Sequence, residues 1–197
     1  MSYTAATTAG TPGAPLFVTF HGTGGTETQF HGLAHQLVPD AHVISPRGDV
    51  SENGMNRYFR RTGEGVYDMD DLATRSAAMA SFLRAAKAEI GANRVIGLGY
   101  SNGANILASV ALSFPDIVDE LILMHPLIPW TPAPQSGLKG RRVLITAGQR
   151  DPICPPTETE VFAQYLVAQR ADVRVEWHPG GHEIAQSELG AIQAFLA

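Results

Sequence analysis

The sequence predicts an α/β fold: a three-layer α/β/α sandwich in which helices cover both faces of a mostly parallel sheet. Short apolar runs alternate with amphipathic stretches of about ten residues or more, and this alternation favours parallel strands joined by right-handed helical crossovers. The chain has 197 residues, 44% hydrophobic and 17% charged, enough to bury a substantial core in one domain. We expect a single domain over residues 16–197, without repeats or linkers, preceded by a flexible arm over residues 1–15.

Each expected element rests on hydrophobic spacing and on residues that start or stop a segment. Strands are predicted over residues 16–21, 43–45, 95–98, 118–124, 142–147 and 173–177. Helices are predicted over residues 27–38, 70–90, 102–114, 157–166 and 183–196. The fourth helix opens on the capping-box pattern of Thr157 and Glu160. Residues 46–69 are expected to form a long, glycine-punctuated loop, which in a compact domain is functional or disordered.

Composition narrows the class of protein. Net charge is −5 and the basic residues do not run together, so nucleic acid is not an expected partner. The first fifteen residues lack the pattern of a secretory signal, and no segment is apolar for long enough to span a membrane. The only cysteine, Cys154, suits a reducing compartment. We expect a cytoplasmic protein. His31, His35 and His42 do not cluster with carboxylates, so no metal site is expected.

A serine motif lies where a predicted strand changes directly into a helix. The residues from Gly99 to Gly103 read Gly-Tyr-Ser-Asn-Gly and fit Gly-x-Ser-x-Gly, the nucleophile elbow. Glycines at both ends prevent collisions in the sharp turn, and the strained turn leaves the Ser101 hydroxyl projecting. The amide of Asn102 then lies at a helix N-terminus, which favours developing negative charge.

Two further residues are expected to meet Ser101 at the same edge of the sheet. Asp151 follows the strand over residues 142–147, and His182 follows the strand over residues 173–177. Ligands of parallel α/β sheets bind beyond the carboxyl ends of the strands. A histidine that takes the serine proton, oriented by a carboxylate, makes the hydroxyl nucleophilic. The backbone amide of Thr23, in the glycine-rich loop after the first strand, is expected to complete an oxyanion hole with that of Asn102.

Competing assignments of the acid and the base are weaker. Asp116 and Asp119 precede the strand over residues 118–124 rather than following it, so they belong at the opposite edge of the sheet. His178 still belongs to a strand end, whereas two glycines free His182 to turn inward.

Two residues near the expected site have open interpretations. His125 follows a strand, and it either borders the pocket or is a packed histidine. Cys154 lies close to Asp151 but not at the elbow, so a cysteine nucleophile does not fit and a packed side chain is the better interpretation.

Substrate contacts are the least defined part of the prediction. Arg57, Arg60 and Arg61 either form a solvated, ion-paired face or clamp a substrate carboxylate. Leu127 and Trp130 fit an apolar acyl pocket as well as a homodimer patch, and the sequence does not separate the two. His21 is assigned to the substrate site, with a structural role, its ring bound to nearby backbone, as the alternative.

These motifs resemble the small, lidless carboxylesterases of the phospholipase/carboxylesterase family, which have the α/β-hydrolase fold. The resemblance covers residues 16–196 and rests on residues 21–25, 99–103, 151–152 and 178–182. It implies Ser101 as nucleophile, His182 as base, Asp151 as orienting acid, and ester hydrolysis without a cofactor. One departure is the arm before Leu16, which is too short and polar for the two antiparallel strands that often open the fold.

The expected function is therefore a carboxylesterase that acts on small or soluble ester substrates through an acyl-enzyme. Residues 125–141 are too few for a helical cap, so access to the site should be open. A thioesterase using the same site, and a ligand-binding protein without turnover, are the alternatives. Because the base must be neutral, kcat/KM should rise with pH through an apparent pKa of about 6–7 and then level off.

Overall fold

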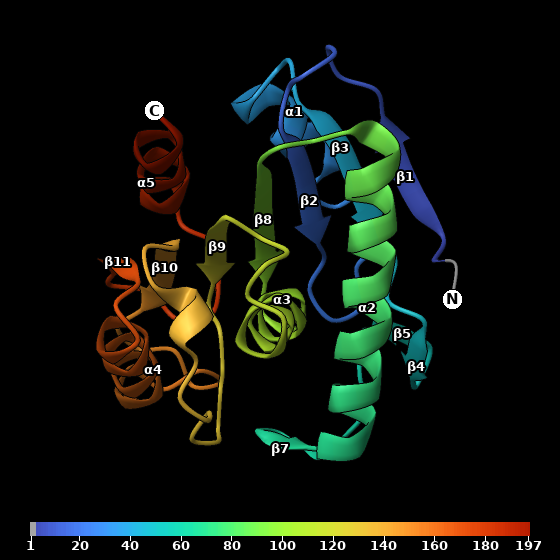
Figure 1. Ribbon diagram of the computed structural model, residues 1–197. Helices are drawn as coiled ribbons and strands as arrows, with labels where there is room; N and C mark the ends of the chain where they lie inside the picture. The colour runs from blue at the N-terminus through green and yellow to red at the C-terminus, as the bar shows by residue number, and fades with distance from the viewer. Residues whose placement is uncertain (1–2) are drawn as a thin grey trace.

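The computed structural model describes residues 3–197 and contains a seven-stranded sheet flanked by helices on both faces (Figure 1). All neighbouring strands are parallel except the first pair, β1 and β3, which is antiparallel. The predicted α/β sandwich is confirmed. The strands in spatial order are β1 (Ala5–Thr8), β3 (His42–Pro46), β2 (Leu16–Phe20), β8 (Val95–Tyr100), β9 (Glu120–Met124), β10 (Arg142–Gly148) and β11 (Asp172–His178).

Five α-helices form the outer layers (Figure 1). One face packs against α2 (Met69–Ile90), α3 (Asn102–Ser113) and α4 (Pro156–Ala168), whose apolar residues share a core cluster with that face of the sheet. The other face packs against α1 (His31–Leu37) and α5 (Gln186–Leu196). Strands β2 and β9 are buried along their whole length, because a parallel sheet covered on both sides needs near-continuous apolar runs.

The parallel strands end at a common edge, and this edge positions the site. The last residue of β8 pairs in register with the last residue of β9, and the same holds for β10 and β11. The residues that follow these strands are therefore neighbours in pairs: Ser101 beside His125, and Gln149 beside Pro179.

The flexible N-terminal arm is a wrong prediction for Ala5–Thr8. These residues form β1, which pairs with β3 in the register Ala5 to Pro46 through Thr8 to Val43. Small and threonine side chains gave no apolar signal, but an edge strand is held mainly by its backbone hydrogen bonds and needs little apolar surface. Residues 1–2 of the expected arm lie outside the described residues.

The predicted long loop over residues 46–69 is also wrong in part, because it contains two hairpins. β4 (Val50–Glu52) pairs with β5 (Met55–Arg57), and β6 (Arg61–Gly63) pairs with β7 (Val66–Tyr67). The first turn is Asn53-Gly54, with φ of +52° and +82°. Positive φ at both central residues is the requirement of a tight two-residue hairpin, for which Asn-Gly is the strongest short sequence signal.

Two helices begin later than predicted, and a third begins without the predicted side-chain cap. α1 begins at His31 instead of residue 27; residues 27–30 form turns, and Glu27 is ion-paired with Arg47. α4 has Pro156 in its first turn and no side-chain cap, so Thr157 does not cap it. α5 begins at Gln186 instead of residue 183.

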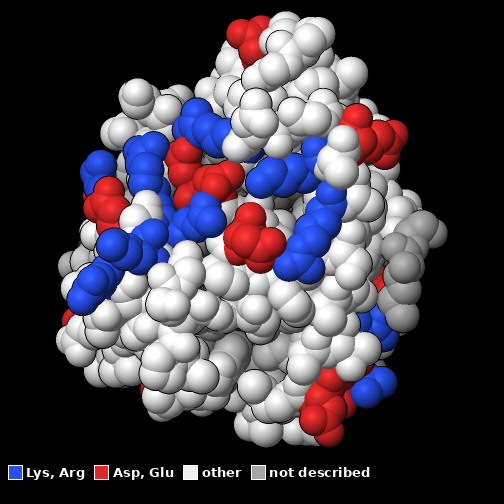
Figure 2. Space-filling view, in the orientation of Figure 1, with Lys and Arg blue, Asp and Glu red and all other residues white. Residues whose placement is uncertain are grey.

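Charged side chains of both signs lie side by side on the face seen in Figure 2. At the amino-terminal edge of the strands, Asp119 accepts a hydrogen bond from the Val95 amide and pairs with Arg141, while Glu120 pairs with Arg94 and Arg142. Asp119 therefore lies at the edge opposite Ser101, as predicted. Among the described residues, the longest apolar helical stretch falls short of what a membrane crossing requires.

Candidate active site

The turn between β8 and α3 holds Ser101 in a strained conformation. Its φ of +52° and ψ of −118° are rare for a residue with a side chain, and such strain concentrates at functional sites. A Cβ on Gly99 would lie 2.5 Å from the Gly103 carbonyl oxygen, and a Cβ on Gly103 would lie 2.4 Å from the Phe20 oxygen. Only glycine fits at both positions, so the motif and the sharp turn require one another.

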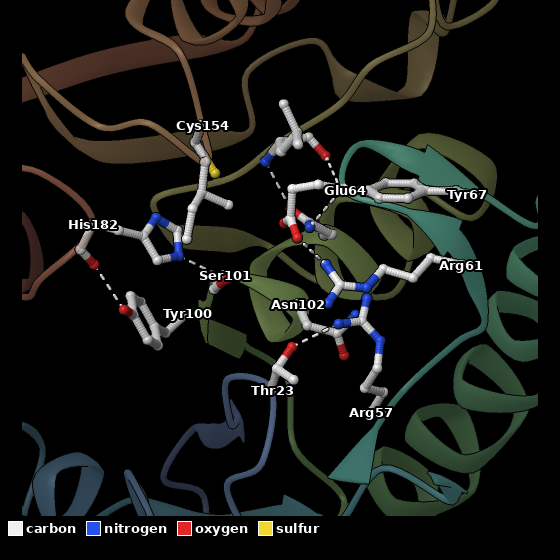
Figure 3. Close-up of a pocket in the computed structure, with 13 residues that line it drawn as sticks. Thr23, Arg57, Arg61, Glu64, Tyr67, Tyr100, Ser101, Asn102, Cys154 and His182 are labelled. Atoms are coloured by element: carbon white, nitrogen blue, oxygen red, sulfur yellow. Dashed lines mark hydrogen bonds and ion pairs between the residues drawn. The ribbon is translucent and has the colours of Figure 1, made fainter. Parts of the chain in front are cut away.

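The side chains of Ser101, His182 and Asp151 form one hydrogen-bonded chain. His182 Nε2 lies 2.8 Å from Ser101 Oγ, and His182 Nδ1 lies 2.7 Å from Asp151 Oδ2. Figure 3 shows the imidazole turned towards Ser101 at one side of the pocket. Because an ionised carboxylate only accepts hydrogen bonds, the His182 proton belongs on Nδ1, which leaves Nε2 free to accept from the serine hydroxyl.

The Asp151 carboxylate is buried and fully hydrogen-bonded. Its Oδ1 accepts from the backbone amides of Ile153 and Cys154, at 2.8 and 2.9 Å. Its Oδ2 faces both His182 Nδ1 and, at 2.8 Å, His125 Nδ1. Burial alone would raise the pKa of Asp151, but these hydrogen bonds outweigh it and lower the pKa below its usual value. Asp151 therefore stays ionised beside His182.

Tyr100 holds the segment that carries His182. Its hydroxyl donates a 2.7 Å hydrogen bond to the His182 carbonyl oxygen, which Figure 3 marks with a dashed line. Tyr100 ends β8, immediately before Ser101, so one residue links the turn of the serine to the backbone of the histidine.

Two residues that line the pocket with Ser101 have backbone amides without an acceptor in the described part of the protein. Thr23 and Asn102 both line the pocket, and within residues 3–197 neither amide donates a hydrogen bond to the protein. The Thr23 loop is held by the hairpin of β4 and β5: Arg57 donates to Thr23 Oγ1 at 2.7 Å, and the Gly24 amide donates to the Asn56 carbonyl at 2.9 Å. The side-chain oxygen of Asn102 accepts a 2.8 Å hydrogen bond from the amide of Tyr58, the residue that follows β5.

The pocket at Ser101 is small, with a volume of about 190 Å³, and has both polar and apolar lining residues. In Figure 3 the guanidinium groups of Arg57 and Arg61 lie across the pocket from His182. Arg61 pairs with Glu64 at 2.6 Å and with Glu52 at 3.1 Å. The other lining residues are Thr23, Tyr67, Tyr100, Ser101, Asn102, Asn105, Leu127, Ile153 and Cys154.

Of the predicted substrate contacts, Arg57, Arg61 and Leu127 line this pocket, and His21, Arg60 and Trp130 do not. His21 is buried, with Nδ1 2.7 Å from the Gly22 oxygen and Nε2 accepting from the Gly48 amide, so both ring nitrogens serve the backbone. This is the structural role named as the alternative.

Arg60 and Trp130 face away from the pocket for different reasons. The Arg60 side chain is 60% exposed and pairs with Asp68 at 3.1 Å, because successive side chains in an extended segment point to opposite sides and Arg61 takes the inner one. Trp130 packs edge-on against Tyr67, with ring centroids 6.1 Å apart, behind the pocket wall.

Several pocket residues were missed by sequence reasoning. Tyr100 and Asn105 belong to the elbow strand and helix, and their proximity to the motif was an available signal. The Asn105 side chain accepts from the Leu127 amide and donates to the Tyr67 hydroxyl. No sequence signal indicated the remaining contacts, which come from β6, β7 and the segment after Asp151: Glu64, Tyr67 and Ile153.

Cys154 lines the pocket as a buried thiol. Its Sγ lies 3.2 Å from the His125 carbonyl oxygen, to which it donates. Burial, together with the charge of Asp151, raises the pKa of this thiol well above its usual value, so it is not a thiolate at neutral pH. The interpretation of Cys154 as a packed residue fits this environment better than a nucleophile does.

Two side-chain triplets bring metal-ligating atoms within 4.8 Å of one another: His125, Asp151 and His182, and His125, His178 and Glu188. In both triplets the nitrogen and carboxylate oxygen atoms face each other directly, at 2.7 to 3.4 Å. The contacts of His125 and His182 are imidazole–carboxylate hydrogen bonds, whereas His178 Nε2 lies 3.4 Å from Glu188 Oε1 without forming one.

Comparison with known proteins places the chain among hydrolases. Residues 10–133 match the model of the Ndr family. The matched region includes the elbow at Ser101 and ends before Asp151 and His182. MhqD of Bacillus subtilis (strain 168), a predicted hydrolase, is 39% identical over 175 residues, which cover 88% of both chains.

Solved structures give the same result. The structure of Atu2452 from Agrobacterium tumefaciens, a protein of unknown function, has a TM-score of 0.93 and 52% identity, and covers 98% of this chain and 95% of its own. A Bacillus cereus carboxylesterase has a TM-score of 0.94 and 34% identity, and covers 98% of this chain and 93% of its own. These similarities support an ester hydrolase with the α/β-hydrolase fold.

Proposed function

The chain belongs to the Ndr family of α/β hydrolases, and from this membership and the geometry at Ser101 we propose that it is a serine carboxylesterase for small, polar esters. One observation carries the proposal: Ser101, His182 and Asp151 are joined by hydrogen bonds of 2.8 and 2.7 Å beside two backbone amides with no protein acceptor. A nucleophile, its base, an orienting carboxylate and an oxyanion hole are the complete set for acyl transfer.

In the first half of the reaction, Ser101 Oγ bonds to the ester carbonyl carbon while its proton passes to His182 Nε2. The carbonyl oxygen becomes an oxyanion, which accepts hydrogen bonds from the amides of Thr23 and Asn102. The bond to the alcohol oxygen then breaks, and His182 returns the proton to the leaving alcohol. In the second half, water attacks the acyl carbon while His182 Nε2 takes its proton. The bond from that carbon to Ser101 Oγ then breaks, His182 returns the proton to Oγ, and the acid is released.

The pocket supports small and polar substrates. A volume of about 190 Å³ lies below the range of about 300–1,000 Å³ of drug-sized ligand sites. Leu127 and Ile153 offer an apolar surface, while Arg61 and Glu64 make the opposite wall polar. The small volume leaves little room for a long acyl chain, so short acyl groups are favoured.

The test is covalent labelling combined with turnover. The wild-type protein, Ser101→Ala and the matched control Ser113→Ala, which lies at the exposed end of the same helix, are treated with a fluorophosphonate probe. They are then assayed on p-nitrophenyl esters from acetate to dodecanoate and on a matched thioester series.

We expect labelling and hydrolysis by wild type and Ser113→Ala, fastest with the shortest chains. Ser101→Ala should lose both, with a fall in kcat of roughly a millionfold. Equal rates for wild type and Ser101→Ala would contradict the proposal. Labelling without ester hydrolysis, together with cleavage of the thioester series, would favour a thioesterase. The absence of both labelling and hydrolysis would favour a binding role, because an inert binder lacks an activated serine.

A further inference from the structure

A second buried polar chain lies behind Asp151, on the side away from Ser101. Asp151 Oδ2, which faces His182, also faces His125 Nδ1 at 2.8 Å. On its other side, His125 Nε2 lies 3.3 and 3.4 Å from the two carboxylate oxygens of Glu188. The side chains of His125, Asp151 and Glu188 are all 0% exposed. One imidazole thus separates two carboxylates in the protein interior.

Glu188 is held in its acceptor form. Its Oε1 accepts from the Ala185 amide at 2.6 Å, its Oε2 accepts from the Thr146 hydroxyl, and His178 Nε2 lies 3.4 Å from Oε1. The His178 ring presents this nitrogen as a donor, because its Nδ1 accepts from the Gly180 amide. The Ala185 amide and the Thr146 hydroxyl donate to Glu188, and His178 Nε2 faces it without forming a hydrogen bond; this setting favours the ionised carboxylate.

The hydrogen-bond partners of the two ring nitrogens then determine the protonation state of His125. Nδ1 must carry a proton to donate to Asp151, which is ionised and already accepts from two amides and His182. An unprotonated Nε2 would direct its lone pair at the ionised Glu188. Two carboxylates without a cation would also be very costly to bury. Protonation of both ring nitrogens removes the lone-pair repulsion and balances the charge.

Two independent features agree with this state. His125 has a φ of +51°, in the left-handed region, so the fold accepts backbone strain to direct this ring between β9 and the segment after β10. Burial opposes its protonation, but the hydrogen bonds of Glu188 and Asp151 outweigh burial and raise the pKa of His125 above its usual value. The same contacts lower the pKa of Glu188 against the effect of its burial.

We propose that His125 is a positioning residue: an imidazolium, held between the buried carboxylates of Asp151 and Glu188, that fixes Asp151 against His182. It touches no reacting atom and acts through Asp151. Its positive charge partly neutralises Asp151 and so weakens the electrostatic attraction of Asp151 for a proton on His182. This consequence for the reaction rests on the proposed function, whereas the charge state of His125 does not.

The titratable or charge-bearing groups that face His125 come from every element around it. They are Asp151 and Cys154 after β10, Glu188 of α5, His178 at the end of β11, His182 in the following loop, and Tyr100 at the end of β8. Asp151 and Glu188 are the groups that pair with its nitrogens.

The direct test measures the protonation state of the His125 ring from the ¹⁵N chemical shifts of the histidine side chains at pH 7.5. His125→Asn assigns the signals by their loss. In wild type, both nitrogens of His125 should carry protons. In Glu188→Gln, which keeps the shape but loses the charge, one nitrogen should become unprotonated. A wild-type His125 ring with an unprotonated nitrogen overturns the proposal, whether or not the protein hydrolyses esters.

The kinetic test is the pH profile of kcat/KM on a short ester. Removal of the imidazolium, about 5.1 Å from the His182 ring, should move the acid limb of the profile upward by about one pH unit in Glu188→Gln and by at least as much in His125→Asn. The control, Ser76→Ala, removes a buried hydrogen bond to Ser109 far from the network and should leave the limb in place. A uniform fall in rate at every pH, with an unmoved limb, would reduce His125 to a structural role.

Discussion

The Tyr100 hydroxyl donates a hydrogen bond to the backbone carbonyl of His182, across 82 residues of sequence, at 2.7 Å. Because Tyr100 immediately precedes Ser101, this bond ties the backbone of the candidate base to the turn that carries the candidate nucleophile. Its loss should affect activity more than stability.

Tyr100→Phe should lower kcat/KM about tenfold, since small displacements of a catalytic group are costly, and should lower the free energy of unfolding by about 1 kcal/mol. The matched control is Tyr165→Phe, which removes a hydroxyl bond to the Ala133 carbonyl away from the pocket. Steady-state kinetics and urea denaturation measure both. Equal activity of the two variants would show that the Tyr100 bond does not position His182.

Substitutions of Asn102 should distinguish the role of its backbone amide from that of its side chain. Asn102→Ala keeps the amide expected to bind the oxyanion but leaves the buried Tyr58 amide without its acceptor, at a cost of about 1–3 kcal/mol in stability. Its kcat should fall less than tenfold. Asn102→Asp places a negative charge next to the developing oxyanion, so its kcat should fall further. If Asn102→Asp were the more active variant on the same esters, the oxyanion assignment would fail.

Gly103→Ala tests the steric requirement of the turn. The added Cβ would lie 2.4 Å from the carbonyl oxygens of Phe20 and His21, which are backbone atoms and cannot move away cheaply. We expect a loss of about 3 kcal/mol in unfolding free energy. Gly190→Ala, in α5, meets no atom within 4 Å and should be stabilising by about 0.5–1 kcal/mol. Thermal and urea denaturation of both variants measure these changes. A Gly103→Ala variant with the unfolding free energy of wild type would show that the turn is not sterically closed.

The raised pKa of His125 predicts a particular pH dependence of stability. A group that binds its proton more tightly in the folded state stabilises fully below its unfolded pKa of about 6.5 and loses that contribution as pH rises through the folded value. The stability difference between wild type and His125→Asn should therefore shrink as pH rises from 6 to 9. Chemical denaturation at several pH values measures this difference. A stability difference that increases with pH would contradict a raised pKa of His125.

Much of the fold and the grouping of the site could be predicted because they depend on local patterns. Buried parallel strands need continuous apolar runs, and a parallel sheet brings the residues after its strands to one edge. For that reason Ser101, Asp151 and His182 could be expected to meet from sequence alone. β1 was missed because backbone pairing leaves no apolar trace, and the first hairpin was missed although Asn53-Gly54 signals one.

The contacts of His125 could not be predicted, for a different reason. Glu188 lies on an amphipathic helix, where a glutamate normally faces solvent, and it is 63 residues from His125. Nothing in the local pattern distinguishes a buried glutamate from an exposed one. Its role emerges only when α5 packs against the sheet, just as Arg60 and Arg61 become distinct only once the hairpins fix which side faces the pocket.

The wide separation of the site residues along the chain has a consequence for the order of folding. Ser101 and His182 are 81 residues apart, so the elbow and its flanking helix can form long before the segment carrying the base is in place. Contacts over such separations close slowly, after local structure has formed. A refolding chain should therefore regain its helical signal first and its activity last, when β11 docks beside β10 and α5 covers them.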